Sequence, residues 1–110
     1  MHAFDVLADP VRRRILELLA KGEHASGEVV TVVQNDFGIT QAAVSQHLRV
    51  LRENGFANVR AEGPRRLYSV DPSGLREVED WLHTLRQQWD QRLDALGTEI
   101  ARGKRKRRRK

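Results

Sequence analysis

The first part of the chain predicts two short helices. Phe4 and Leu7 are separated by three positions, which indicates a helix over residues 3–8. Asp9 and Pro10 follow as an N-cap and a first-turn residue, and they start a second helix that ends at Lys21. The apolar stripe of this second helix consists of Val11, Ile15, Leu18 and Leu19.

The next segment predicts two further helices joined by a tight turn at residues 38–40. Ser26 is expected to cap a third helix that runs to about Asp36. The many valines of this segment would also suit a strand, but the absence of strict alternation favours the helix. Thr40 is expected to cap a fourth helix that ends at Asn54, because Gly55 suits the left-handed position after a helix. The buried stripe of the fourth helix is predicted to be Val44, Leu48 and Leu51.

A hairpin and a long helix complete the pattern. Residues 57–62 and 65–70 are predicted strands, joined at Gly63 and Pro64, and Pro64 leaves the turn type open. A last helix opens at Ser73, and its apolar residues follow a nearly heptad spacing, which is typical of helices that pair with another helix. These residues are Leu75, Val78, Leu82, Leu85, Trp89, Leu93, Leu96 and Ile100. The predicted fold is mostly α with one small β-hairpin, in a single domain over residues 1–101.

The net charge of +5 belongs to one end of the chain. Residues 102–110 hold 8 of the 20 Lys and Arg and no acidic residue, so residues 1–101 carry 12 basic and 15 acidic side chains. We expect residues 102–110 to be a disordered basic tail, because like charges repel and nothing apolar is available to pack. Within residues 1–101, only residues 40–70 are net basic, at +3. This segment is where a polyanion is expected to bind.

The fourth helix has an outward face suited to the major groove of DNA. With its apolar stripe turned inward, the opposite face holds Ala42, Ser45, Gln46, Arg49 and Glu53. Small residues allow close approach, and glutamine can pair with adenine through two hydrogen bonds. The N–H groups near Thr40 and Gln41, at the helix start, can bind a phosphate. Taken alone, the pattern also fits an ordinary amphipathic surface helix.

The predicted hairpin places further cations beside that helix. Arg60, Arg65 and Arg66 lie on or near its tip, from which they can reach phosphates or the minor groove. In isolation these arginines would equally fit a solvated hairpin. The order helix, turn, helix and basic hairpin is more specific than any single part, and it predicts a protein that binds double-stranded DNA.

Two segments of the sequence resemble the ArsR-type (arsenical-resistance-repressor-like) winged-helix family. Residues 7–19 read Leu-Ala-Asp-Pro-Val-Arg-Arg-Arg-Ile-Leu-Glu-Leu-Leu, and residues 37–55 read Phe-Gly-Ile-Thr-Gln-Ala-Ala-Val-Ser-Gln-His-Leu-Arg-Val-Leu-Arg-Glu-Asn-Gly. The run Val-Ser-Gln-His-Leu at residues 44–48 is the most specific part. The resemblance continues through the hairpin, which is the wing of this fold, and through Trp81, Leu82 and Trp89. It covers about residues 3–100.

The resemblance implies a winged helix-turn-helix fold and a repressor that binds a palindromic operator as a homodimer. It places Gln41, Ala42, Ser45 and Gln46 opposite DNA bases. It also places the first and last helices at the dimer interface, where the expected apolar contacts are Phe4, Leu7, Trp81, Leu85 and Trp89; these residues would alternatively form intramolecular core. His47 lies nearer the buried stripe, so we expect it to pack or hydrogen-bond within the fold rather than contact a base.

Several other chemistries lack the residues that they need. The chain has no cysteine, which excludes disulfides and thiolate metal sites. Asp80 and His83 are three positions apart but no second histidine follows, so we expect no metal and no cofactor, as in the metal-independent members of the family. No nucleophile–base pair, carboxylate pair or glycine-rich phosphate loop points to an enzyme. No apolar run of membrane-spanning length and no signal-peptide pattern occurs, and we expect a cytoplasmic protein.

The strongest alternative to a sequence-specific regulator is an architectural protein that binds DNA of any sequence. The basic tail at residues 102–110 favours this alternative, because clustered cations add salt-dependent affinity for any duplex. The tail would also suit a merely solubilising end. We expect it to raise non-specific affinity and the association rate without choosing the site. The sequence indicates no particular inducer.

Overall fold

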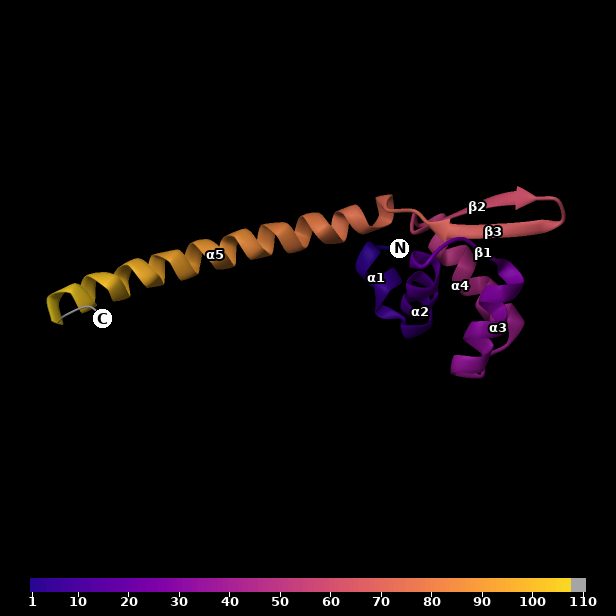
Figure 1. Ribbon diagram of the computed structural model, residues 1–110, viewed down its shortest axis with the longest axis horizontal. Coiled ribbons are helices and arrows are strands. Elements are labelled where there is room, and N and C mark those ends of the chain that lie inside the picture. Colours follow the sequence, from indigo (N-terminus) through magenta and orange to yellow (C-terminus); the bar gives the residue numbers. More distant parts are fainter. Residues whose placement is uncertain (108–110) are drawn as a thin grey trace. The chain divides into compact units, whose positions relative to one another are not determined.

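The computed structural model describes the backbone of residues 1–107 and the side chains of residues 1–98. Its elements follow one another as shown in Figure 1: α1 (Ala3–Ala8), α2 (Pro10–Ala20), β1 (His24–Ala25), α3 (Ser26–Phe37), α4 (Gln41–Glu53), β2 (Ala57–Glu62), β3 (Arg65–Val70) and α5 (Ser73–Arg107). The five predicted helices and both hairpin strands are confirmed. The two-residue strand β1 is an addition that the hydrophobic pattern did not indicate.

The start of α2 is capped as predicted. The Asp9 carboxylate accepts the backbone N–H of Val11 at 2.7 Å and that of Arg12 at 3.3 Å, and Pro10 occupies the first helical position. These contacts satisfy donors that have no partner inside the helix. Because they connect near neighbours in the chain, the Asp-Pro pair was sufficient to locate this boundary.

The starts of α3 and α4 differ from one another. Thr40 caps α4 as predicted, since its hydroxyl accepts the N–H of Ala43 at 3.1 Å. The prediction that Ser26 caps α3 is wrong, because Ser26 is already the first helical residue and Ala25 precedes it as the cap. The Glu28 carboxylate accepts the Ala25 N–H at 2.7 Å, so the third helical residue contributes the side-chain contact at this helix start, with a different N–H from the one that a serine cap would bind.

The end of α4 has the hydrogen bonds of a Schellman motif. Gly55 has a φ of 77°, a backbone conformation that only glycine adopts at little cost. The Phe56 N–H reaches the Leu51 carbonyl at 2.8 Å, and the Gly55 N–H reaches that of Arg52 at 3.3 Å. Phe56 is thereby brought into the core, where it is only 1% exposed.

The three strands form an antiparallel sheet in the order β1-β3-β2. In the hairpin Val59 pairs with Tyr68 and Glu62 pairs with Arg65, so the loop consists of Gly63 and Pro64 alone. Gly63 has a φ of 59°, and proline cannot adopt a positive φ, which matches the type II′ turn favoured by two-residue hairpins. β1 pairs with β3, the central strand, through Ala25 and Leu67.

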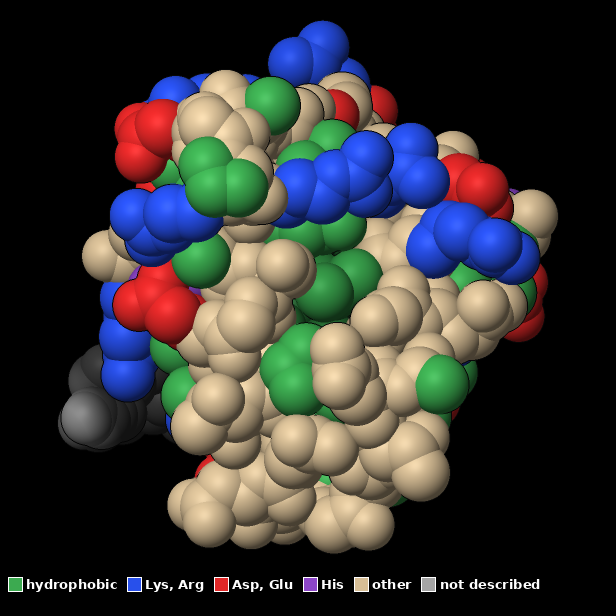
Figure 2. Space-filling model, turned by 90° about the vertical axis from the view of Figure 1, so that its right-hand side faces the viewer, with side chains coloured by type: hydrophobic (Ala, Val, Ile, Leu, Met, Phe, Trp, Pro, Cys, Tyr) green, Lys and Arg blue, Asp and Glu red, His purple; other side chains and the backbone are tan. Residues whose placement is uncertain are grey.

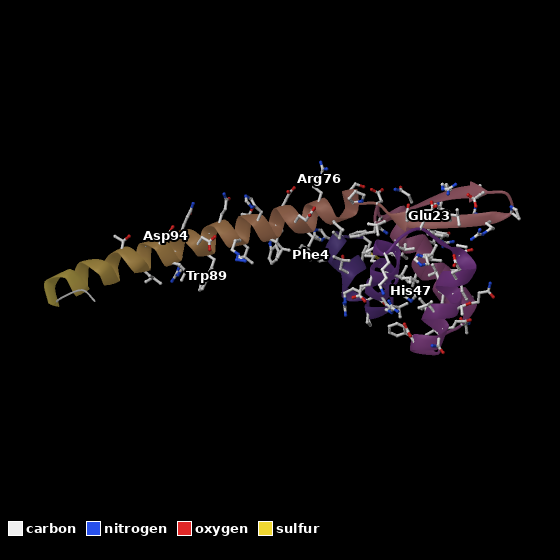
Figure 3. All side chains as sticks on the ribbon, viewed as in Figure 1. Phe4, Glu23, His47, Arg76, Trp89 and Asp94 are labelled. Carbon is white, nitrogen blue, oxygen red and sulfur yellow. The ribbon has the colours of Figure 1, made fainter. Side chains whose placement is uncertain are left out.

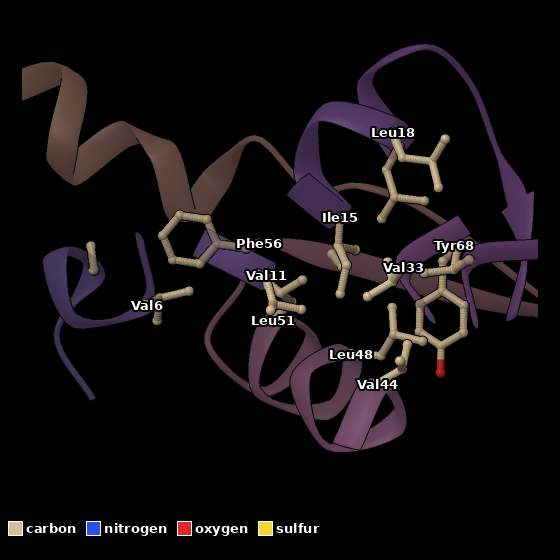
Figure 4. Packing of buried hydrophobic residues seen from close by; sticks show 14 residues of the cluster. Val6, Val11, Ile15, Leu18, Val33, Val44, Leu48, Leu51, Phe56 and Tyr68 are labelled. Carbon is tan, nitrogen blue, oxygen red and sulfur yellow. The ribbon is translucent and has the colours of Figure 1, made fainter. Parts of the chain in front are cut away.

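The hydrophobic core lies between α2, α3, α4 and the sheet (Figure 4). Val6 from α1, Ile15 from α2, Val33 from α3 and Leu51 from α4 are each completely buried. The predicted stripes of α2 and α4 are confirmed, since all of their members belong to this cluster. One apolar side from each helix and one side of the sheet therefore account for the core.

The chain divides into two compact units, residues 1–78 and residues 79–110. The first unit holds α1 to α4, the sheet and the first turns of α5, and the second holds the rest of α5. The helix continues to Arg107, although disorder is expected from residue 102. Lysine and arginine are good helix formers, and a helix satisfies its own backbone hydrogen bonds without an apolar partner. The tail's side chains, and residues 108–110 entirely, lie outside the described residues.

Candidate nucleic-acid interface

The outward face of α4 carries the side chains that the helical spacing predicts. Val44, Leu48 and Leu51 are buried, and this orientation turns the other side of the helix to solvent. The predicted contact residues on this side are all exposed: Thr40, Gln41, Ala42, Ser45, Gln46 and Arg49. No long or branched apolar side chain stands among them, so the helix can approach a flat or concave partner closely.

The turn before α4 fixes the angle at which this face is presented. Gly38 ends α3 with a φ of 66°, and its N–H reaches the Gln34 carbonyl at 2.8 Å. The Gln34 side chain then donates to the Ile39 carbonyl at 3.1 Å. Because Thr40 caps α4 immediately afterwards, the turn has little freedom. α3 and α4 together form a helix-turn-helix.

His47 is half-buried and faces α2 rather than solvent. Its Nδ1 lies 3.4 Å from Nη1 of Arg12. A guanidinium has no acceptor atom, so in this contact Arg12 donates and the imidazole nitrogen accepts. Arg12 also donates from Nε to the Val6 carbonyl at 2.8 Å and from Nη2 to the Asp5 carbonyl at 3.0 Å. Arg12 thus connects α1 and α2 to the non-outward side of α4.

Asp9 completes this polar cluster beside α4. Partial burial raises the pKa of Asp9, but the N–H bonds from Val11 and Arg12 and the charges of His47 and Arg12 outweigh it. The pKa of Asp9 therefore lies below its usual value. Asp9 is ionised at neutral pH, where its charge strengthens the cap of α2.

The wing arginines are paired to very different degrees. Arg60 binds the Glu23 carboxylate through two nitrogens, at 2.7 and 2.8 Å, and also reaches Glu62 at 3.3 Å. The hydrogen bond from Arg60 and its positive charge lower the pKa of Glu23, so the pair is ionised and Arg60 is neutralised locally. Arg65 is only loosely paired, 3.9 Å from Glu28 and 3.8 Å from Glu62. Of the three predicted arginines, Arg60 is thus the least available to a polyanion.

Two other arginines have no partner among the described side chains. Neither the Arg52 side chain on α4 nor the Arg66 side chain on β3 forms an ion pair or a hydrogen bond within residues 1–98, while the Arg49 side chain has only a 3.8 Å pair with Glu53. Arg52 was not among the predicted contact residues. Its position could have been found from the sequence, because it follows Ser45 by seven residues and so shares its side of the helix.

These arginines border a groove of about 270 Å³ between α4 and the wing. Arg49, Arg52 and Arg66 line it together with three hydroxyl-bearing residues, Ser26, Ser45 and Tyr68. Figure 2 shows Lys and Arg side chains crossing one face of the molecule in a band over hydrophobic atoms, next to a surface that is largely uncharged. A positively charged strip thus runs alongside an uncharged polar one.

The part of α5 beyond residue 78 exposes an apolar stripe along its own surface. Trp81 is 51% exposed, Leu85 47% and Trp89 55%, and Leu93 and Leu96 continue the stripe. Trp89 and Asp94 project from opposite sides of the helix (Figure 3), so the apolar residues are confined to one side. Of the other predicted interface residues, Phe4 is exposed and Leu7 packs partly against the core of residues 1–78.

The part of the chain that the structure describes contains neither a candidate metal site nor a candidate membrane-spanning helix. No three histidine, aspartate or glutamate side chains there come together in a way that could hold a metal ion. None of the described helices is sufficiently long and apolar to cross a membrane.

The sequence matches a family model described as a helix-turn-helix domain over residues 7–60. The HTH-type transcriptional regulator Rv2034 of Mycobacterium tuberculosis is 44% identical over 67% of this chain, and the match spans 65% of that regulator, just under two thirds of its length. The crystal structure of a possible transcriptional regulator for arsenical resistance is 33% identical, covers 90% of this chain and 96% of its own, and superposes with a TM-score of 0.67.

A third similar protein is a homodimer. The solution structure of the homodimeric winged helix-turn-helix DNA-binding domain of Mb0332 from Mycobacterium bovis, a possible ArsR-family regulator, is 26% identical. It covers 78% of this chain and 76% of its own, with a TM-score of 0.58. The motif, the wing and these similarities agree: the chain belongs to the ArsR-type family of winged helix-turn-helix transcriptional regulators.

Proposed function

We propose that this chain is a sequence-specific DNA-binding repressor that acts as a homodimer on a palindromic operator. The observation that carries the proposal is the outward face of α4, where Gln41, Ala42, Ser45 and Gln46 are all exposed opposite a buried stripe. An α-helix fits the major groove, and base edges there are distinguished by hydrogen-bonding side chains of this kind. Thr40, at the start of α4, adds backbone donors for a phosphate.

Each part of the interface has its own task in this proposal. Ser45 and Gln46 read base edges, and Ala42 lets the helix approach closely. Arg49, Arg65 and Arg66 position the protein on the phosphates, which sets register without reading sequence. Arg60 does so only if its pair with Glu23 opens. A dimer bound over a promoter would repress by excluding the polymerase.

The homodimer is supported by α5 and by the homodimeric relative. The exposed stripe that contains Leu85, Trp89 and Leu93 follows nearly heptad spacing, which suits pairing with the same helix of a second copy. Two-fold symmetry would place the two α4 helices roughly 34–36 Å apart, one turn of DNA, and explains why the operator should be a palindrome.

The decisive experiment measures discrimination between DNA sequences. The full-length protein selects an operator from a randomised duplex pool, and fluorescence anisotropy then compares that operator with a shuffled duplex. We expect a preference of at least about a thousandfold. Ser45→Ala and Gln46→Ala should each lower that preference by an amount on the order of 1–3 kcal/mol per lost base contact.

Gln87→Ala is the matched control, because it removes the same amide from an exposed position of α5 away from the apolar stripe. It should leave the preference unchanged. Equal wild-type affinity for selected and shuffled duplexes would support the architectural alternative instead. An unchanged preference in both the Ser45 and Gln46 variants would show that another face reads the DNA.

A further inference from the structure

The groove between α4 and the wing is lined by positively charged and hydroxyl-bearing side chains, which the folding of α4 and β3 does not require. Its polar lining consists of the guanidinium groups of Arg49, Arg52 and Arg66 and the hydroxyls of Ser26, Ser45 and Tyr68. Among the described residues no carboxylate lines it, and the only acidic group there that pairs with one of these arginines is Glu53, 3.8 Å from Arg49. A concave surface with three cations and no anion attracts a negatively charged group.

Two of the three arginines at this groove have no polar side-chain partner among the described residues, in contrast to Arg60 and Arg65 on the outer part of the wing. The guanidinium groups of Arg52 and Arg66 form no ion pair or hydrogen bond with the described residues, whereas that of Arg60 binds Glu23 at 2.7 Å. Arginine side chains bind phosphate through two parallel N–H groups, and a guanidinium that is not already paired loses no protein contact by doing so.

Tyr68 adds a neutral donor at the same place. It belongs to β3, and its ring is part of the buried cluster with only 7% of the residue exposed (Figure 4). The residue nevertheless lines the groove, and its hydroxyl makes no hydrogen bond within the described residues. A ring fixed by the core presents its hydroxyl with little conformational freedom, which favours a specific acceptor.

We propose that this groove holds one phosphate of the DNA backbone, with Arg52 and Arg66 as charged donors and the Tyr68 hydroxyl as a third donor. The inference rests on the proposed function: it joins Arg66, a predicted contact residue, to Arg52 and Tyr68, which lie outside the predicted contact set. Ser45 belongs both to the outward face of α4 and to the groove, so a duplex that is read at Ser45 brings a backbone phosphate to the adjoining side. That phosphate anchors the register in which α4 meets the bases.

The test compares Arg52→Gln, Arg66→Gln, the double variant and Tyr68→Phe on the selected operator and on a shuffled duplex, over a range of salt concentrations in phosphate-free buffer. Each arginine variant should weaken binding to both duplexes equally, by roughly tenfold, because a phosphate contact carries no sequence information. Tyr68→Phe should have a smaller, equally uniform effect. Arg76→Gln is the control: it removes an exposed cation from α5 that does not line the groove, and it should change neither affinity nor salt dependence.

The salt dependence distinguishes one shared phosphate from two. Neutralising one phosphate contributes about 0.9 to the slope of log affinity against log salt, so the double variant should lose about 0.9 per protomer. A loss of about 1.8 would mean that the two arginines contact separate phosphates and would overturn the proposal. So would unchanged affinity in both single variants, or a selective loss on the operator, which would make Arg52 a base-reading residue.

Two further outcomes separate this inference from the proposed function. Wild-type protein that binds no duplex contradicts the proposed function itself, whatever the groove does. Stoichiometric binding of inorganic phosphate that Arg52→Gln abolishes, with DNA affinity unchanged by the same variant, assigns the groove to a free anion and overturns only the inference. Circular dichroism of each variant verifies the fold, which we expect to be retained because neither arginine side chain forms an ion pair or a hydrogen bond with the described residues.

Discussion

Gly74, in the first turn of α5, lies directly against the end of α4. A Cβ at this position would stand 2.6 Å from the Gly55 carbonyl oxygen and 2.7 and 2.8 Å from two atoms of the Phe56 ring. Real Cβ atoms do not approach other atoms so closely. The Gly74 N–H also donates to the Gly55 carbonyl at 2.7 Å, so the backbones cannot separate without losing this bond.

Gly74→Ala should therefore destabilise the protein by about 1–3 kcal/mol, the usual cost of forcing an extra methyl group into a packed site. Gly27→Ala is the matched control. Gly27 lies in α3 with no atom within 4 Å of its would-be Cβ, and alanine there should raise the stability by up to about 1 kcal/mol. Urea unfolding followed by circular dichroism measures both changes; equal midpoints for the two variants would contradict the prediction.

At the same scale, the role of each arginine depends on residues far away in the sequence. Arg60 was predicted from its hairpin position to contact DNA, but its partner Glu23 lies 37 residues earlier. β1 precedes α3 and pairs with β3, which brings Glu23 beside the wing. Sequence spacing contains no information on this pairing. The position of Arg52, by contrast, could be predicted from helical periodicity, because it shares the side of α4 that holds Ser45.

Helix boundaries illustrate the element scale, since most of them follow from contacts between near neighbours. The Asp9 cap, the Thr40 cap and the glycine-dependent ends of α3 and α4 involve residues at most five positions apart. The same locality explains the error at Ser26: two side chains could cap α3, and Glu28 does so. β1 was missed because a two-residue strand has no periodicity of its own and exists only through β3.

The Asp9 cap predicts how acid affects the first unit. Asp9→Ala should cost about 1 kcal/mol of unfolding free energy at pH 7, and Asp9→Asn less, because asparagine also accepts the capping hydrogen bonds. The pKa of Asp9 is lowered in the folded protein. Its ionisation therefore contributes stability that is fully present above about pH 4, the pKa of an unfolded aspartate, and is lost as the pH falls through the lower folded value.

Asp9→Asn should remove the part of the pH dependence of stability that comes from the ionisation of Asp9. Thermal unfolding of the wild type and the Asn variant between pH 2 and pH 7 measures it, and the stability difference should shrink towards low pH. A difference that stays constant over this range would show that the charge of Asp9 contributes nothing beyond the cap.

At the scale of the whole molecule, the oligomeric state depends on whether a second copy covers the apolar stripe on α5. Leu85 and Trp89 are about half exposed in the single chain, and Leu93 and Leu96 continue the stripe. We expect sedimentation at micromolar concentration to give a dimer, and Leu85→Glu or Trp89→Glu to give a monomer, because a buried carboxylate without a partner is costly. Gln87→Glu adds the same charge on the opposite side and should leave the dimer intact. A wild-type monomer at this concentration would contradict the prediction.

Loss of the dimer should also weaken DNA binding, since a monomer contacts one half-site only. The comparison of Leu85→Glu with Gln87→Glu on the selected operator measures this coupling. Neither substitution changes α4 or the groove. Equal operator affinity in the two variants would mean that one copy of the reading helix is sufficient.

The sequence by itself determined the helices, the hairpin, the inward stripe of α4 and the set of side chains on its outward face. These features depend on helical periodicity and on caps, which are local in the chain. Only the tertiary structure decided which arginines are available, because ion pairs such as Arg60 with Glu23 and the groove between Arg52 and Arg66 join residues that are distant in sequence. The division at residue 78 was likewise invisible to a pattern that continues without a break along α5.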